Sequence, residues 1–135
     1  MLAGRATLAL PALAAALLIA ACGGDSAPPV HARDGVVRLR MEEFRFVPQR
    51  FQVPSGRVRI VATNVGILTH DVAVVSENVK PGDQPKKYGR TPTAHPGQTV
   101  SGSLTLHSGK YRLSDTIANH DSLGQYGELI VGSGR

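Results

Sequence analysis

The sequence predicts one all-β domain, a Greek-key β-sandwich, preceded by an export signal. Short runs of alternating apolar and polar residues recur at spacings of about 8–12 residues, separated by turns rich in Gly and Pro. Outside the N-terminal apolar run, no segment shows the apolar stripe with a period of 3.6 residues that marks an amphipathic helix. A chain of 135 residues is long enough for one such domain.

Residues 1–21 read as a lipoprotein signal peptide. Arg5 is the only charged side chain before an apolar run that ends in small residues directly before Cys22. The run is shorter than the roughly 20 residues that a spanning helix needs. Its end resembles the bacterial lipobox, in which the cysteine becomes the lipidated first residue. We therefore expect an extracytoplasmic lipoprotein held on the membrane through Cys22, in the periplasm or on the outer surface of a bacterial cell; a transmembrane anchor and plain export are the alternatives.

Cys22 is also the only cysteine of the chain. A single cysteine cannot form an intrachain disulfide, and a lipidated one cannot bind a metal, so the folded domain holds no thiolate. Residues 22–35 are small, polar and rich in proline, which predicts a flexible tether in which His31 is solvated. The domain itself is expected over residues 36–135.

The strands follow from the alternation of apolar and polar residues. Val37, Leu39 and Met41 alternate with charged residues and predict a half-buried strand. Phe44 and Phe46 continue this periodicity, and Pro48 ends it. The apolar members of the strands that follow are Phe51 and Val53, Val58, Ile60 and Ala62, and Leu68, His70, Val72 and Val74, with Asp71 on the opposite face. A last pair of strands is expected before and after the turn at residues 107–109.

Residues 76–98 are the least regular part of the predicted domain. They contain four prolines and the cations Lys80, Lys86, Lys87 and Arg90. Such a loop could steer the domain toward acidic partners or lipid head groups, or it could be a solvated crossover. Without Arg5 the chain holds 14 basic and 10 acidic side chains, a net charge of +4 spread along the strands. We expect no binding to nucleic acid, because aromatic stacking platforms are absent.

The stretch from Gly109 to Gly132 carries the strongest functional signal. It reads as a strand, a polar loop and a return strand. Asp115 stands where the inward-facing apolar row of the first strand would end, and His120 and Gln125 follow at intervals of five residues. A tight loop would bring these three polar side chains together, as a metal site at the end of a sandwich requires.

This stretch resembles the C-terminal segment of the cupredoxins, the plastocyanin- and azurin-like blue copper domains. Their segment has the form Tyr-x-x-x-Cys-x-x-x-x-His-x-x-x-x-Met-x-Gly, and Tyr111, Asp115, His120, Gln125 and Gly127 fall in that register. The resemblance extends over roughly residues 36–131, and the run LTHDVAV supplies an upstream histidine, His70. It implies the same sandwich fold and a copper site.

The resemblance makes His70 and His120 the imidazole ligands, with Asp115 at the thiolate position and Gln125 at the axial position. A carboxylate is a harder donor than a thiolate and stabilises Cu(I) poorly, so the usual electron transfer should be impaired. Two imidazoles and a carboxylate suit Cu(II), Zn or non-haem Fe, and Cu(II) leads the affinity order. We therefore expect a pale copper-binding protein for extracytoplasmic metal handling.

The sequence is also compatible with two other functions. The metal site could be lost, which would leave a metal-free module for protein–protein interaction in which Asp115 accepts hydrogen bonds from the histidines. The domain could also serve metal-transport machinery. An enzyme is not expected, because no G-x-S-x-G motif is present and Ser114 should face away from Asp115.

Two further groups of polar residues bear on the site. Asn64 and Asp71 are expected to support the ligands by hydrogen bonds, as the resemblance suggests for the residue after the upstream histidine; both could instead be turn or surface residues. His95 and His107 each precede a turn and are expected at the surface. His95 would become a third imidazole ligand only if the long loop folded over the site.

Overall fold

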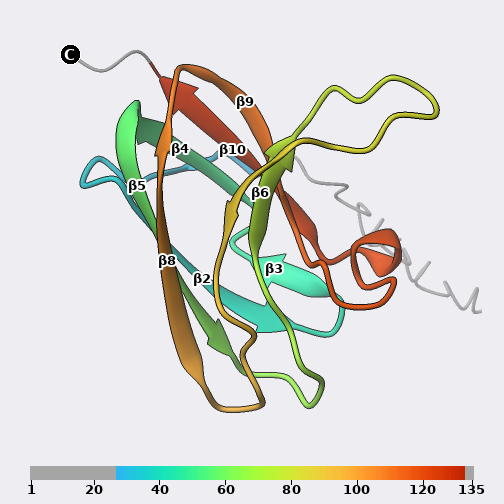
Figure 1. Cartoon of the computed structure of the whole chain (residues 1–135). Coiled ribbons are helices and arrows are strands. Elements are labelled where there is room, and N and C mark those ends of the chain that lie inside the picture. The colour runs from blue at the N-terminus through green and yellow to red at the C-terminus, as the bar shows by residue number, and fades with distance from the viewer. Residues whose placement is uncertain (1–26, 133–135) are drawn as a thin grey trace, which may run out of the picture.

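Two packed β-sheets form the domain, as expected (Figure 1). The computed structural model describes residues 27–132, so the predicted signal peptide and Cys22 lie outside the described part. The strands are β1 (Val30–His31), β2 (Val36–Glu42), β3 (Arg45–Val47), β4 (Arg50–Pro54), β5 (Gly56–Asn64), β6 (Ala73–Ser76), β7 (Lys87–Arg90), β8 (Thr99–Leu106), β9 (Gly109–Ser114) and β10 (Tyr126–Gly132). One short 3-10 helix, η1 (Asp121–Leu123), precedes β10.

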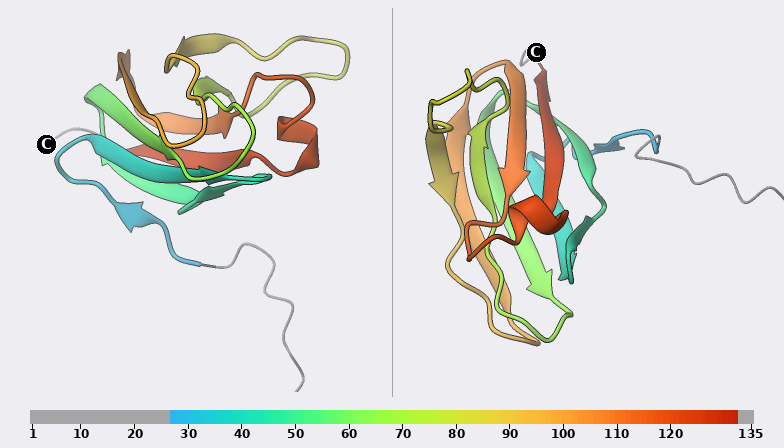
Figure 2. Two further views of the ribbon diagram at one scale, coloured as in Figure 1. Left: turned by 90° about the horizontal axis from the view of Figure 1, so that it is seen from below. Right: turned by 90° about the vertical axis from the view of Figure 1, so that its right-hand side faces the viewer.

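One sheet has the strand order β1-β4-β10-β9-β6-β7 and the other β3-β2-β5-β8. Both sheets mix parallel and antiparallel pairs: β2 runs parallel to β5 and β4 runs parallel to β10, whereas β9 is antiparallel to β6 and β10. Figure 2 shows the two sheets face to face, with the loop before β10 projecting from one end. The long connections between sheets are those of a Greek-key sandwich.

The core lies between the sheets and consists of the alternate residues of each strand. Val37, Leu39 and Met41 on β2 and Val58, Ile60 and Ala62 on β5 are all buried, which confirms the predicted alternation. Phe46 and Phe51 are the largest fully buried side chains. Burial of a large apolar side chain contributes about 1.5–3 kcal/mol to folding, so this interior is the main source of stability.

Four parts of the chain differ from the expected strand pattern. The predicted strand from Leu68 to Val74 begins only at Ala73, as β6; Leu68 is 40% exposed, and Asp71 is 1% exposed because its carboxylate binds Thr116. The predicted tether contributes β1, which pairs parallel to β4 and buries Ala32, because β4 would otherwise leave an open edge. The first strand does not continue to Phe46; the chain reverses after Glu42, and Phe46 pairs with Met41 from β3. The irregular segment 76–98 contains β7, which pairs with β6. Among the described residues, no helix is long and apolar enough to cross a bilayer.

Candidate metal site

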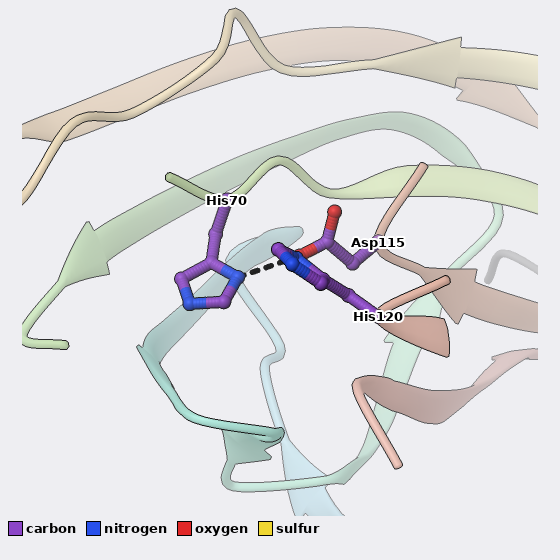
Figure 3. A group of neighbouring side chains, drawn as sticks. All are labelled: His70, Asp115 and His120. Atoms are coloured by element: carbon purple, nitrogen blue, oxygen red, sulfur yellow. Dashed lines mark hydrogen bonds and ion pairs between the residues drawn. The ribbon is translucent and has the colours of Figure 1, made fainter. Parts of the chain in front are cut away.

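Three predicted ligands meet at one end of the sandwich (Figure 3). One donor atom from each of His70, Asp115 and His120 lies within 4.8 Å of the other two. The Oδ2 atom of Asp115 is the shared partner, at 2.6 Å from Nδ1 of His70 and 3.1 Å from Nδ1 of His120. The two imidazole rings are 5.0 Å apart between centroids.

The strand ends bring these residues together. Asp115 directly follows β9 and His120 directly precedes η1, so both belong to the loop between β9 and β10. His70 lies between β5 and β6, where its backbone N–H and C=O both pair with Ala94. Because β6 pairs with β9, with Ala73 opposite Ser114, the start of one strand lies beside the end of the other. The imidazole of His70 therefore reaches the loop that carries Asp115.

Burial differs between the three side chains. His70 and Asp115 have no exposed side-chain area, whereas 12% of the His120 side chain is exposed. The ring of Phe44 packs at 5.1 Å from the His120 ring and covers it from the β2–β3 turn. A carboxylate and two imidazoles in such a shielded place interact more strongly with a cation than they would in water.

Glu43 is a site residue that the sequence analysis did not identify. Its Oε1 atom accepts a hydrogen bond from Nε2 of His70 at 3.1 Å and further bonds from the backbone N–H groups of Ile67 and Leu68 at 2.8 and 2.9 Å. Gly66 leaves room for this carboxylate, because a Cβ atom at that position would lie 2.1 Å from Oε1. The sequence signal was weak: Glu43 lies in a turn that the alternation assigned to a continuous strand.

The hydrogen bonds that Glu43 accepts lower its pKa. The backbone N–H of Leu68, and then the imidazole of His70 and the N–H of Ile67, hold the pKa of Glu43 below its ordinary value, although partial burial opposes this shift. The side chain is therefore a carboxylate at neutral pH. Each nitrogen of the His70 ring thus faces a carboxylate oxygen, Glu43 on one side and Asp115 on the other.

Asp71 links the two chain segments that carry the ligands. It is 1% exposed, and its carboxylate accepts hydrogen bonds from the backbone N–H and the hydroxyl of Thr116, at 2.7 and 2.5 Å. Arg90 approaches the same carboxylate at 3.7 Å. Since Asp71 follows His70 and Thr116 follows Asp115, this contact fixes the distance between the backbones of two predicted ligands.

Asn64 supports the loop before His70 without touching the imidazole. It is fully buried, and its Nδ2 donates to the carbonyl oxygens of Leu68 and Ala94 at 2.7 and 2.9 Å. Its Oδ1 accepts from the N–H of Gly66. Asn64 therefore holds the loop that supplies the N–H groups for Glu43 and also the residue that pairs with His70. The supporting roles of Asn64 and Asp71 remain predictions.

The backbone of Gln125 forms hydrogen bonds with the backbones of His120 and Asp115. Its N–H donates to the carbonyl of His120 at 3.0 Å, and its carbonyl accepts from the N–H of Asp115 at 3.1 Å. The side chain is fully buried; Nε2 donates to the carbonyl of Arg45 at 3.3 Å. Among the described residues, Oε1 of Gln125 is the only buried side-chain N or O atom without a hydrogen-bond partner. Such an atom is costly unless another group satisfies it.

The other histidines lie away from this cluster. His95 and His107 are exposed; Nδ1 of His95 is 3.4 Å from the Thr69 hydroxyl, and the His107 carbonyl accepts from the Tyr111 hydroxyl. His31 is exposed on β1. Ser114 donates its hydroxyl proton to Asp121 rather than to Asp115.

The donor set fits a metal ion. Donors bound to one ion at about 2.0–2.1 Å in a tetrahedral arrangement stand roughly 3.3 Å apart. The two nitrogens lie 2.6 and 3.1 Å from the Asp115 oxygen, and all three donor atoms lie within 4.8 Å of one another. The buried Oε1 of Gln125, in the same loop, has no hydrogen-bond partner and is the predicted fourth donor. Two nitrogens and carboxylate or amide oxygens are borderline to hard donors, which suit Cu(II) and Zn better than Cu(I).

Comparison with solved structures identifies the fold. An auracyanin from the photosynthetic bacterium Roseiflexus castenholzii superposes with a TM-score of 0.64 at 17% identity, covering 74% of this chain and 98% of that one. Auracyanin A, a blue copper protein from Chloroflexus aurantiacus, gives 0.62 at 21% identity, covering 78% and 100%. Auracyanin B gives 0.63 at 20% identity, covering 78% and 91%. No protein-family model and no curated protein matches the chain. The described domain therefore has the cupredoxin-like fold.

Proposed function

We propose that this protein binds Cu(II) at a non-blue site formed by His70, Asp115 and His120, with Gln125 as a weak fourth donor, and serves metal handling outside the cytoplasm. The observation that carries the proposal is the convergence of both Nδ1 atoms on one carboxylate oxygen in a shielded place. A bound ion would supply positive charge between these donors, and the residues of the chain would hold it in place. The role is one of binding and not of catalysis.

Electron transfer of the blue-copper type is expected to be impaired. A thiolate gives copper a soft, covalent partner that suits both oxidation states, whereas a carboxylate favours Cu(II). Asp115 stands at the position where the cupredoxin segment carries its cysteine. Anchoring through a lipid on Cys22 would place the domain at the outer face of a membrane, where a protein partner in metal handling or transport could receive the ion.

A titration with Cu(II), combined with electron paramagnetic resonance, tests the copper site. The chain from Gly23 onward is expected to bind one Cu(II) without an intense blue absorption band. His70→Ala and His120→Ala should remove saturable binding, while His95→Ala, which changes an exposed histidine outside the cluster, should leave it intact. Uptake that does not depend on His70 and His120 would refute the site.

Asp115→Cys provides a sharper test of the loop geometry. If the loop between β9 and β10 holds the donors as the cupredoxin segment does, the sulfur should produce a strong blue or green absorption with Cu(II). A folded variant that stays colourless with bound copper would show that the loop does not present residue 115 to the metal.

A second candidate function is a metal-free interaction module. It is favoured by one observation: the carboxylate of Asp115 already accepts hydrogen bonds from both histidines and, through Oδ1, from the N–H of Ile117 at 2.9 Å. These bonds satisfy the buried carboxylate without an ion. Absence of any saturable metal binding by the folded protein would favour this alternative.

A further inference from the structure

Glu43 adds a second negative charge to the proposed metal site. Its Oε1 atom contacts Nε2 of His70, while Asp115 contacts Nδ1 on the other side of the same ring. In the described part of the chain, the polar contacts of both carboxylates are with N–H groups and imidazoles, not with Lys or Arg. The other acidic residues nearby do have cationic partners: Asp71 has Arg90 and Asp121 has Arg112.

The charge of the site follows from these contacts. When both imidazoles bind the ion through Nδ1 they are neutral, and Asp115 alone would then balance a monovalent ion, since one negative and one positive charge cancel. With Glu43 included, the two carboxylates balance a divalent ion and leave a monovalent ion with one uncompensated negative charge. The His70 and Asp115 side chains have no exposed area, whereas 26% of the Glu43 side chain is exposed, so water screens part of its charge. An uncompensated charge costs most where the side chains are shielded from water.

Glu43 also determines which nitrogen of His70 is free to bind. A neutral imidazole carries one N–H and one lone pair. The acceptor at Nε2 is fixed, because the same oxygen is held by the N–H groups of Ile67 and Leu68 and fits the space left by Gly66. Nε2 therefore keeps its proton, and a metal ion would bind at Nδ1, releasing to solvent the proton that Nδ1 shares with Asp115 in the metal-free protein. A carboxylate on the far nitrogen raises the basicity of a ligating imidazole.

We infer that Glu43, acting through His70, increases the preference of this site for a divalent ion over Cu(I), beyond the preference that the Asp115 carboxylate gives as a donor. The inference rests on the proposed copper site and goes beyond it, because it assigns the charge preference to a residue that is not a ligand. Glu43 is therefore a positioning residue and not a ligand. Removing its charge should weaken Cu(II) binding more than Cu(I) binding, whereas a purely structural role would weaken both equally.

Glu42 provides a matched control. It is the neighbouring carboxylate in sequence, but it contacts Arg45 at 2.9 Å and Arg40 at 3.5 Å and not the histidines. The variants are Glu43→Gln, which keeps an oxygen acceptor but removes the charge, and Glu42→Gln. All measurements use the full chain carrying Cys22→Ser, so that no thiol binds Cu(I).

The experiment measures the dissociation constants of Cu(II) and, under anaerobic conditions, of Cu(I), by competition with chelators of known affinity. The reference protein should bind Cu(II) more tightly than Cu(I). Glu43→Gln should lose about tenfold or more in Cu(II) affinity, within the range typical of groups that support a ligand, and keep its Cu(I) affinity within about threefold. Glu42→Gln should match the reference protein.

Three outcomes would overturn the inference. A reference protein that binds Cu(I) more tightly than Cu(II) refutes it even if the variants fail to fold. If Glu43→Gln weakens the binding of both ions equally, or of neither, the charge preference is refuted, but the proposed copper site is not. Binding of neither ion by the reference protein refutes the copper site itself, and the inference falls with it.

Nitrogen NMR of the histidines in the metal-free protein gives a second measurement. His70 should show a proton on Nε2 that exchanges slowly with water, and Glu43→Gln should retain it because the amide oxygen can accept the same bond. Glu43→Ala should lose this protection. An unprotected Nε2 proton in the reference protein would remove the positioning role.

Discussion

The two histidines of the site differ in how firmly the fold holds them. His70 is fully buried, both of its ring nitrogens contact carboxylates, and its backbone pairs with Ala94. His120 is 12% exposed, contacts one carboxylate through Nδ1 and lies in a loop covered by the ring of Phe44. One imidazole is thus part of the structural interior, while the other closes the site from the solvent side.

The largest expected difference concerns folding stability. His70→Ala should lower the free energy of unfolding of the metal-free protein by about 3–5 kcal/mol, because it leaves the buried Asp115 carboxylate and Glu43 without their shared partner. His120→Ala should cost about 1 kcal/mol, since Asp115 keeps its bonds to His70 and Ile117. Urea denaturation monitored by circular dichroism measures both. Equal losses would contradict the difference between the two histidines.

Asp71→Ala tests whether the link between Asp71 and Thr116 sets the position of Asp115 relative to His70. The change removes two hydrogen bonds to Thr116 and should lower the free energy of unfolding by about 2–3 kcal/mol. It should also weaken Cu(II) binding, because Asp115 would no longer be fixed relative to His70. Asp83→Ala, at an exposed carboxylate in the 76–98 segment, is the control for denaturation and titration. Unchanged Cu(II) affinity in a destabilised Asp71→Ala protein would show that the link is only structural.

Gln125→Leu examines the unpartnered amide oxygen in the loop of His120. The substitution removes one long hydrogen bond of 3.3 Å and an unsatisfied buried oxygen. The free energy of unfolding of the metal-free protein should therefore change by about 1 kcal/mol or less. Cu(II) affinity should fall by less than tenfold, and the electron paramagnetic resonance spectrum should shift. A spectrum identical to that of the unchanged protein would exclude Gln125 as a donor.

The smallest effect is a pH dependence at Glu43. Because its pKa is lower in the folded protein than the ordinary value of 4.5, the carboxylate contributes stability above that value and loses it as the pH falls through its folded pKa. The stability difference between the unchanged protein and Glu43→Gln should therefore narrow on acidification. Denaturation of both proteins at neutral pH and below pH 4.5 measures this difference. A stability difference that increases in acid would contradict a lowered pKa of Glu43 in the folded protein.

Some parts of the structure follow from the local sequence pattern, whereas others depend on contacts between distant segments. The strands were predictable because alternation of apolar and polar residues directly reports which side of a sheet is buried, as β2 and β5 show. β1 was not predictable, because two exposed residues in a polar segment carry no alternation and pair only because β4 offers an open edge. The convergence of Asp115 and His120 followed from a short loop, whereas that of His70 was inferred from resemblance alone.

What the sequence determined by itself is the sandwich, its strand faces and the absence of a thiolate in the folded domain. Only the tertiary structure decided the surroundings of His70. Glu43 lies 27 positions before His70, and the two meet because the chain reverses after β2 and the loop at Gly66 leaves space for a carboxylate. No local periodicity encodes a contact between two loops, since their distance depends on how the parallel strands β2 and β5 end side by side.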